Sequence, residues 1–182
     1  MGAKWVELLK EIAPTVTRVG VIRDPTSTAS IGQFAAIQSA ALSLGWEVSP
    51  LGGRDARDIE RTVTEFARGS NCGLITVGTP LVISNRDLII SLAARHRLPA
   101  VYPFRLFVAD GGLISYGPDT VDPFRQAAGY VDRILKGEKP AAFLRLITSS
   151  NLVAPCTGRS YVEAERHGVP SSLLSRANEI IE

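Results

Sequence analysis

The chain has 182 residues, enough for one α/β domain of ordinary size or one domain with an appendage, and too few for two full domains. Its hydrophobic fraction of 45% and charged fraction of 21% are typical of a globular protein and exclude wholesale disorder. The formal net charge of +2 gives no electrostatic basis for binding a polyanion, so we expect no nucleic-acid partner.

Helical and strand patterns alternate from the beginning of the chain. Residues 4–13 carry apolar side chains at helical spacing and end at Pro14, and an apolar strand follows over residues 16–22. A polar loop then leads into a helix over about residues 29–44, whose apolar stripe includes Ile31.

The same alternation continues to residue 136. The sequence next predicts a strand beginning at 46–48, a helix from Asp55 or Asp58 to 67, a strand over 74–77 and a loop over 78–80. A helix capped by Ser84 or Asn85 and ending at His96 follows. The remaining predicted elements are a strand over 100–102, a helical turn over 105–109, a strand over 113–116 and a helix over 121–136. Strands separated by helices in this way predict the α/β class, with right-handed βαβ units forming a doubly wound parallel sheet of five strands.

In an open parallel sheet, ligands bind outside the carboxyl ends of the strands. Four loops follow such ends, and among them Tyr102 and Tyr116 are candidate walls of an aromatic pocket. Each tyrosine has core or rim packing as its alternative. The hydroxyl-rich loop after the first strand could hold a carboxylate or phosphate at the start of the next helix, or Thr28 or Ser30 could simply cap that helix.

The residues predict binding rather than catalysis. The loops lack the glycines of a nucleotide-binding motif, Ser115 is not in a GxSxG sequence, and no nucleophile is paired with a base. Cys72 lies in an apolar run and is expected to pack as a small hydrophobic residue. With two cysteines and two histidines, we expect no metal site and no cofactor. No run approaches the ~20 apolar residues of a membrane span, and the first residues lack the pattern of a signal peptide.

Several longer stretches identify a family. The segments RDLII, ARHRLPAVYPFR, GGLISYG and YVDRILKGEKP, together with the opening KWVELLKEI and the ending VPSSLLSRANEIIE, resemble the ABC-transporter substrate-binding proteins of the tryptophan/tyrosine-binding-like family. Such proteins are type I periplasmic binding proteins, in which two α/β lobes joined by crossovers close on a small ligand and present it to a membrane permease. They carry out no chemistry.

The resemblance implies a function, partners and a location for this chain. It implies that the chain binds a small, amino-acid-like solute, with aromatic amino acids among the candidates, for an ABC permease, in the periplasm or as a lipid-anchored protein outside the cytoplasm. Residues 1–120 correspond to the second, ligand-binding lobe, and residues 121–182 to a crossover helix and a C-terminal appendage that ends in a helix. Family members are longer, with a signal and a complete first lobe, so we expect a truncated chain that by itself binds ligand weakly or not at all.

The resemblance also implies which residues of this lobe contact the ligand. They lie in the four loops at the carboxyl edge of the sheet and are Asp24, Thr26, Ser27, Thr28, Ser30, Thr79, Pro80, Tyr102, Phe104, Tyr116, Gly117 and Asp119. Two stretches depart from the family pattern. Arg23-Asp24-Pro25 stands where the family has Asn-Pro, and residues 143–168 do not align.

Other interpretations remain at this stage. A lactose-repressor-type effector domain shares the architecture but should accompany a helix-turn-helix segment, and a flavodoxin-like or Rossmann-like enzyme requires a phosphate loop or a catalytic pair. The predicted 121–136 helix carries an apolar stripe that would pack on a first lobe. Without such a cover, we expect the stripe to form a homodimer or to leave an association-prone monomer.

Overall fold

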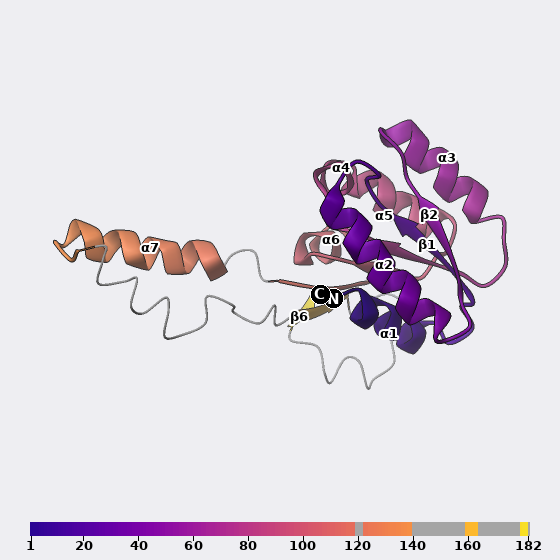
Figure 1. Ribbon diagram of the computed structural model, residues 1–182, viewed down its shortest axis with the longest axis horizontal. Helices are drawn as coiled ribbons and strands as arrows, with labels where there is room; N and C mark the ends of the chain where they lie inside the picture. The colour runs from indigo at the N-terminus through magenta and orange to yellow at the C-terminus, as the bar shows by residue number, and fades with distance from the viewer. Residues whose placement is uncertain (119–121, 140–158, 164–178, 182) are drawn as a thin grey trace.

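The computed structural model describes residues 1–118, 122–139, 159–163 and 179–181. It shows an α/β arrangement in which one central sheet is covered by helices on both faces (Figure 1). In the same view, helix α7 (Asp122–Leu135) stands apart from these layers. Among the described residues, no helix is both long and apolar enough to cross a membrane.

Within the described ranges, the sheet contains seven strands in the order β2-β1-β3-β4-β5-β6-β7. The strands are β1 (Arg18–Ile22), β2 (Glu47–Leu51), β3 (Cys72–Thr76), β4 (Ala100–Tyr102), β5 (Ile114–Gly117), β6 (Arg159–Glu163) and β7 (Glu179–Ile181). The first five pair in parallel, which confirms the predicted doubly wound sheet. Strand β6 runs antiparallel to β5 and parallel to β7.

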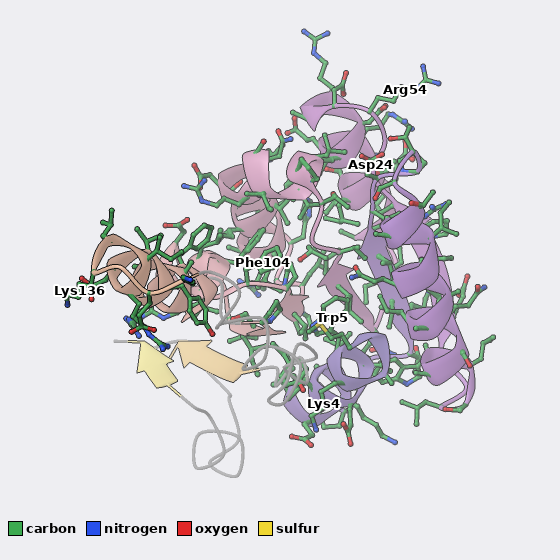
Figure 2. All side chains as sticks on the ribbon, turned by 60° about the vertical axis from the view of Figure 1, so that its left-hand side comes forward. Lys4, Trp5, Asp24, Arg54, Phe104 and Lys136 are labelled. Carbon is green, nitrogen blue, oxygen red and sulfur yellow. The ribbon has the colours of Figure 1, made fainter. Side chains whose placement is uncertain are left out.

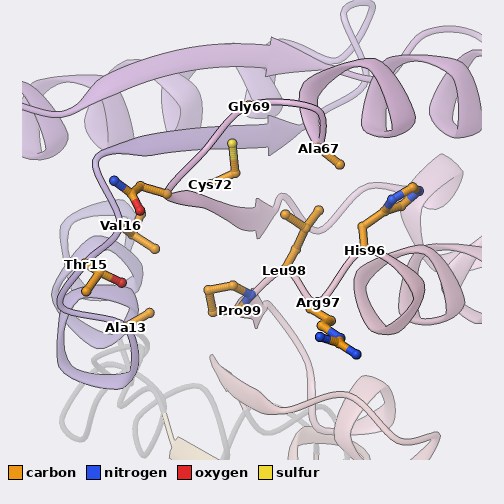
Figure 3. Close-up of a pocket in the computed structure, with 11 residues that line it drawn as sticks. Ala13, Thr15, Val16, Ala67, Gly69, Cys72, His96, Arg97, Leu98 and Pro99 are labelled. Carbon is orange, nitrogen blue, oxygen red and sulfur yellow. The ribbon is translucent and has the colours of Figure 1, made fainter.

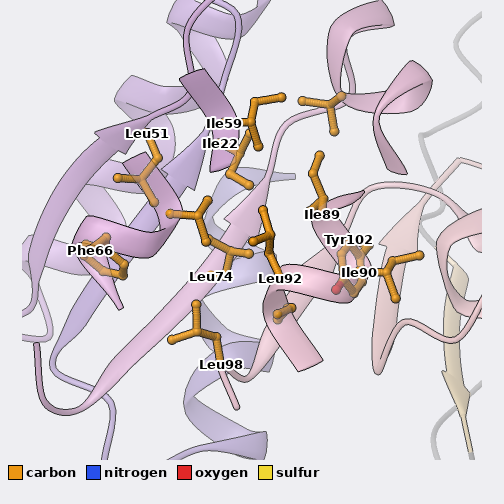
Figure 4. Close-up of a cluster of buried hydrophobic side chains, with 14 of the residues drawn as sticks. Ile22, Leu51, Ile59, Phe66, Leu74, Ile89, Ile90, Leu92, Leu98 and Tyr102 are labelled. Atoms are coloured by element: carbon orange, nitrogen blue, oxygen red, sulfur yellow. The ribbon is translucent and has the colours of Figure 1, made fainter. Parts of the chain in front are cut away.

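Helices on the two faces bury two separate apolar clusters. One face is covered by α1 (Gly2–Ile12) and α2 (Thr28–Leu42), which pack on the inward side chains of β1, β3 and β4. The opposite face is covered by α3 (Ala56–Phe66), α4 (Pro80–Ser84), α5 (Arg86–Arg95) and α6 (Arg105–Ala109). Figure 4 shows this second cluster, in which Leu74 and Tyr102 from the sheet meet Ile59, Ile89 and Leu92 from the helices.

Local chemistry explains where the helices begin. Ser27 and Asp55 cap α2 and α3 by accepting hydrogen bonds from the amides of Ser30 and Asp58, at 3.4 and 2.9 Å. The sequence predicts a cap from Ser84 or Asn85 at α5, but the Asn85 side chain instead donates to the carbonyl of Leu81 at 2.8 Å.

Three elements were not predicted. Helix α4 occupies part of the predicted loop at 78–80, and β6 and β7 extend the sheet beyond the expected five strands. Strand β7 also replaces the expected terminal helix over its three residues. These strands form through pairing with distant residues, which a local apolar pattern does not reveal.

One predicted core residue is on the surface. Ile31 is 51% exposed, whereas Ile37 and Ala41 of the same helix are fully buried. Helix α2 is apolar over much of its circumference, so its sequence did not distinguish the inward face from the outward one. Cys72 is buried as predicted.

Candidate functional site

The carboxyl ends of β1, β3, β4 and β5 lie at one edge of the sheet because these strands are parallel. The predicted site residues follow or end these strands, so the topology brings their four loops to the same edge. Asp24 and Phe104, which follow β1 and β4, are labelled in Figure 2. Asp119 and residue 121 lie outside the described residues.

The loop after β1 is held by its own side chains. One carboxylate oxygen of Asp24, Oδ1, accepts the amide of Thr26 at 2.8 Å and the hydroxyl of Thr26 at 2.6 Å. The pKa of Asp24 is lowered, first by the hydroxyl hydrogen bond and then by the amide hydrogen bond, with burial acting weakly in the opposite direction. Asp24 therefore carries a fixed negative charge at the edge.

Other hydroxyls of this loop differ in exposure. Thr28 is exposed and Ser27 is partly buried, with its hydroxyl oxygen used as the α2 cap. Ser30 is fully buried, and its Oγ has no hydrogen-bond partner among the described residues. The residue that caps α2 is therefore Ser27 and not Thr28 or Ser30 as predicted, and the Ser30 hydroxyl has no capping role.

The loop after β3 also contains a helix cap. Thr79 is 3% exposed, and its Oγ1 accepts the Val82 amide at 3.4 Å. Pro80 occupies the first turn of α4 and is exposed. Within this loop, Pro80 is therefore more accessible to a ligand than Thr79.

The two tyrosines lie on opposite faces of the sheet. Tyr102 pairs in register with Ser115, so these two side chains point to the same face. Tyr116 follows Ser115 in β5 and therefore points to the other face. Tyr102 is 1% exposed and stacks on Phe107, with ring centroids 5.1 Å apart. Tyr102 is thus a core residue in this structure and does not form an accessible wall with Tyr116, because the register separates their side chains.

Tyr116, Phe104 and Gly117 remain at the edge. Tyr116 is partly buried against the α1/α2 face, and its carbonyl accepts the Trp5 indole N–H at 2.6 Å. A Cβ on Gly117 would lie 1.7 Å from the carbonyl oxygen of Pro103, so this close approach requires glycine. The Phe104 ring similarly lies against Gly78, where an added Cβ would be 2.8 Å from it.

Arg23 was not predicted as a site residue. It directly follows β1, and its guanidinium carbon lies 4.9 Å from the centroid of the Phe34 ring. Its buried Nε has no hydrogen-bond partner among the described residues. The sequence did mark this position as unusual, because Arg23-Asp24-Pro25 stands where the family has Asn-Pro.

A cavity of about 260 Å³ lies elsewhere, beside the amino ends of β3 and β4 (Figure 3). It is lined by residues that include Thr15, Asn71, Cys72, His96 and Pro99. Burial raises the pKa of the Cys72 thiol, an effect that nearby Arg18 opposes, so the thiol stays protonated near neutral pH. The cavity is therefore separate from the predicted carboxyl-edge site, and nothing in it is an activated nucleophile.

A metal centre has no support in the described ranges. Over residues 1–118, 122–139, 159–163 and 179–181, no three His, Cys, Asp or Glu side chains come together as ligands.

Comparisons with known proteins give a family and a fold. Residues 2–152 match the family described as ABC transporter substrate binding protein. A comparison with curated proteins found no match.

Three solved structures share the fold of the chain. The ABC domain in complex with L-Trp from Streptococcus pneumonia has a TM-score of 0.76 and 24% identity, covering 99% of this chain and 62% of that chain. A conserved domain protein from Vibrio cholerae has a TM-score of 0.75 and 22% identity, with coverage of 99% and 60%. The ligand-free, open form of a substrate binding protein with adhesive properties from Clostridium difficile has a TM-score of 0.68 and 18% identity, with coverage of 98% and 59%. The present chain thus spans 59 to 62% of the length of these structures.

Proposed function

Since this chain belongs to the ABC transporter substrate binding protein family, we propose that it binds a small solute and presents it to an ABC permease in a membrane. The match over residues 2–152 is the observation that carries the proposal. The five parallel strands support it, because they bring the loops after β1, β3, β4 and β5 to the same edge.

We propose an amino-acid-like ligand, with aromatic amino acids among the candidates. The similar structure from Streptococcus pneumonia is a complex with L-Trp, which supports this class. The accessible or partly accessible members of the proposed site in this structure are Asp24, Thr26, Ser27, Thr28, Pro80, Phe104 and Tyr116. The solute is bound without chemical change in this proposal.

The family match favours this proposal over the two alternatives. A repressor-type effector domain and a flavodoxin-like or Rossmann-like enzyme share parallel α/β architecture, but the matched family is one of transporter substrate-binding proteins. Family membership also supports a location outside the cytoplasm. Whether the protein is periplasmic or lipid-anchored belongs to the proposal.

The division of the chain is also proposed. Residues 1–120 would form the ligand-binding lobe, and residues 121–182 a crossover helix and appendage. Two observations support a separate role for α7, namely its position apart from the layered helices in Figure 1 and its exposed apolar side chains. We propose that a second copy of the chain covers this apolar face in a homodimer.

Titration of the ¹⁵N-labelled chain with L-tryptophan, followed by nuclear magnetic resonance, tests the proposed ligand site. We expect saturable changes in the amide signals of the loops after β1, β3 and β5. Tyr116→Ala should weaken binding roughly tenfold through loss of aromatic contact. Tyr130→Ala, the same change on α7, should leave affinity unchanged. Absence of saturable binding for all twenty amino acids, or changes confined to the cavity near Cys72, would contradict the proposal.

A further inference from the structure

Three buried polar atoms around the beginning of α2 have no hydrogen-bond partner among the described residues. They are Nε of Arg23, Oγ of Ser30 and Oε1 of Gln33. A buried polar group without a partner destabilises the folded state, and such groups in native proteins are normally paired. Three of them on neighbouring segments point to a polar group that is absent from the described residues.

Two of the three atoms, from Ser30 and Gln33, belong to α2, and the third comes from Arg23 in the loop before it. Ser30, Gln33 and Phe34 are separated by three and four positions, which places them on the same side of the helix with Cβ atoms about 5–6 Å apart. Arg23 joins this face through its guanidinium group, which lies over the Phe34 ring at 4.9 Å. The cluster is therefore formed where β1 ends and α2 begins, at the carboxyl edge of the sheet.

The charges in this cluster favour an anion. Arg23 forms no ion pair among the described residues, and the neighbouring Asp24 directs Oδ1 to Thr26. Helix α2 has 15 residues, and its amino end adds a partial positive charge. Its cap from Ser27 accepts the amide of Ser30 but leaves the Ser30 hydroxyl unpaired.

Among small anions, a carboxylate matches the donors. The guanidinium group is planar, and its contact with Phe34 fixes the plane in which Arg23 donates. Two parallel hydrogen bonds from an arginine to a carboxylate are a strong and directional arrangement. The Ser30 hydroxyl can donate to the same anion, while Gln33 Oε1 is an acceptor for a donor on the same ligand.

We propose that Arg23 and Ser30 bind the carboxylate group of the solute. This inference rests on the proposed function and adds to it the chemical group that this lobe recognises. Arg23 is then a specificity-determining residue, with Phe34 holding its guanidinium group in place. A solute that lacks the carboxylate would leave the two donors unpaired and would bind more weakly.

Sodium acetate and neutral acetamide provide a direct test at constant ionic strength. The readout is the side-chain Nε–H signal of Arg23 in the ¹⁵N-labelled chain. We expect a saturable shift with acetate and none with acetamide. Arg23→Gln should abolish acetate binding, and Arg23→Lys should not restore it because lysine lacks the planar pair of donors. Arg57→Gln is the matched control, since Arg57 is exposed on α3.

Ser30→Ala gives a second test that does not depend on losing a charge. The Ser30 hydroxyl has no partner, so its removal should leave the thermal midpoint unchanged or higher without acetate. The same variant should bind acetate several-fold more weakly. A lower thermal midpoint with unaltered acetate affinity would show a structural role and would overturn the proposal.

The outcomes separate this inference from the proposed function. Binding of L-tryptophan with no response of Arg23 to either L-tryptophan or acetate would retain the function and overturn the inference. An Arg23 response to acetate without binding of any amino acid would support the anion site and contradict the amino-acid ligand. Equal shifts with acetate and acetamide would also overturn the inference, because the site would then not recognise charge.

Discussion

At the end of α5, Arg97 holds a backbone conformation that usually belongs to glycine. Its φ is 52°, and the amides of Arg97 and Leu98 donate to the carbonyls of Ala94 and Ala93 at 3.2 and 2.9 Å. This pair of hydrogen bonds is the Schellman ending of a helix, in which the residue after the cap is left-handed. A residue with a Cβ is strained there.

Replacement of Arg97 by glycine should therefore stabilise the protein. We expect Arg97→Gly to raise the free energy of unfolding by about 0.5–1 kcal/mol, because relief of strain exceeds the added flexibility of the unfolded chain. Arg95→Gly, two residues earlier inside α5, should lower it by about 1 kcal/mol. Urea unfolding measures both changes, and equal destabilisation by the two variants would refute the strain argument.

The hydrogen bonds at Asp24 predict a pH dependence. Its pKa in the folded protein lies below the usual value of 3.8, so the stabilising contribution is present above that value and is lost as the pH falls through the folded pKa. Thr26→Val removes the hydroxyl hydrogen bond, which is the largest cause of the lowered pKa. The variant should therefore raise the Asp24 pKa, although the amide hydrogen bond remains. Carboxyl ¹³C titration measures the shift. Thr28→Val, on an exposed neighbour, should leave the Asp24 pKa unchanged.

At the scale of single elements, Gly20 allows side chains of α3 and β2 to pack closely on strand β1. A Cβ at this position would lie 2.4 Å from Cδ1 of Leu51 and 2.9 Å from Cε1 of Phe66. Both neighbours belong to the buried cluster on the α3/α5 face, where free space is scarce. The absence of a side chain at Gly20 is thus a packing requirement.

Two glycine-to-alanine changes should have opposite effects. Gly20→Ala should lower the free energy of unfolding by about 1–3 kcal/mol through overpacking. Gly32→Ala lies in α2, where an added Cβ meets no atom within 4 Å, and should raise it by about 0.5–1 kcal/mol. Chemical denaturation of the two variants measures both changes in the free energy of unfolding. A neutral Gly20→Ala change would mean that Leu51 and Phe66 move aside easily.

The sequence predicted the elements with a strong local pattern. Strands β1 and β3 are short apolar runs between helical patterns, and they were identified together with their parallel direction. Strands β6 and β7 were missed because their pairing with β5 and with each other joins segments far apart in the chain.

The candidate site was also predicted only as far as local patterns allow. The edge location of its loops follows from topology, whereas the opposite faces of Tyr102 and Tyr116 follow from a register that one sequence does not reveal.

At the scale of the whole molecule, α7 presents apolar side chains to solvent. Phe124, Val131 and Leu135 are 77%, 54% and 82% exposed and are separated by seven and four positions, which places them along one side of the helix. An exposed apolar face of this kind favours association. The stripe therefore supports the proposed homodimer.

Sedimentation velocity over a range of concentrations tests this association. We expect a concentration-dependent dimer, which Val131→Glu with Leu135→Glu should convert to a monomer, because dimerisation would bury the introduced charges. Lys136→Glu changes an exposed charge directly after α7, outside the stripe, and should retain the dimer. A monomer at all concentrations in the unmodified protein would rule out the homodimer.

The strand order also bears on how the sheet can assemble while the chain is being synthesised. Strand β2 adds to one side of β1, β3 adds to the other, and each later strand adds beside the one before it. Among the strands that the structure describes, none has to insert between two partners that are already joined. This part of the sheet can therefore extend outward in the order in which its residues leave the ribosome.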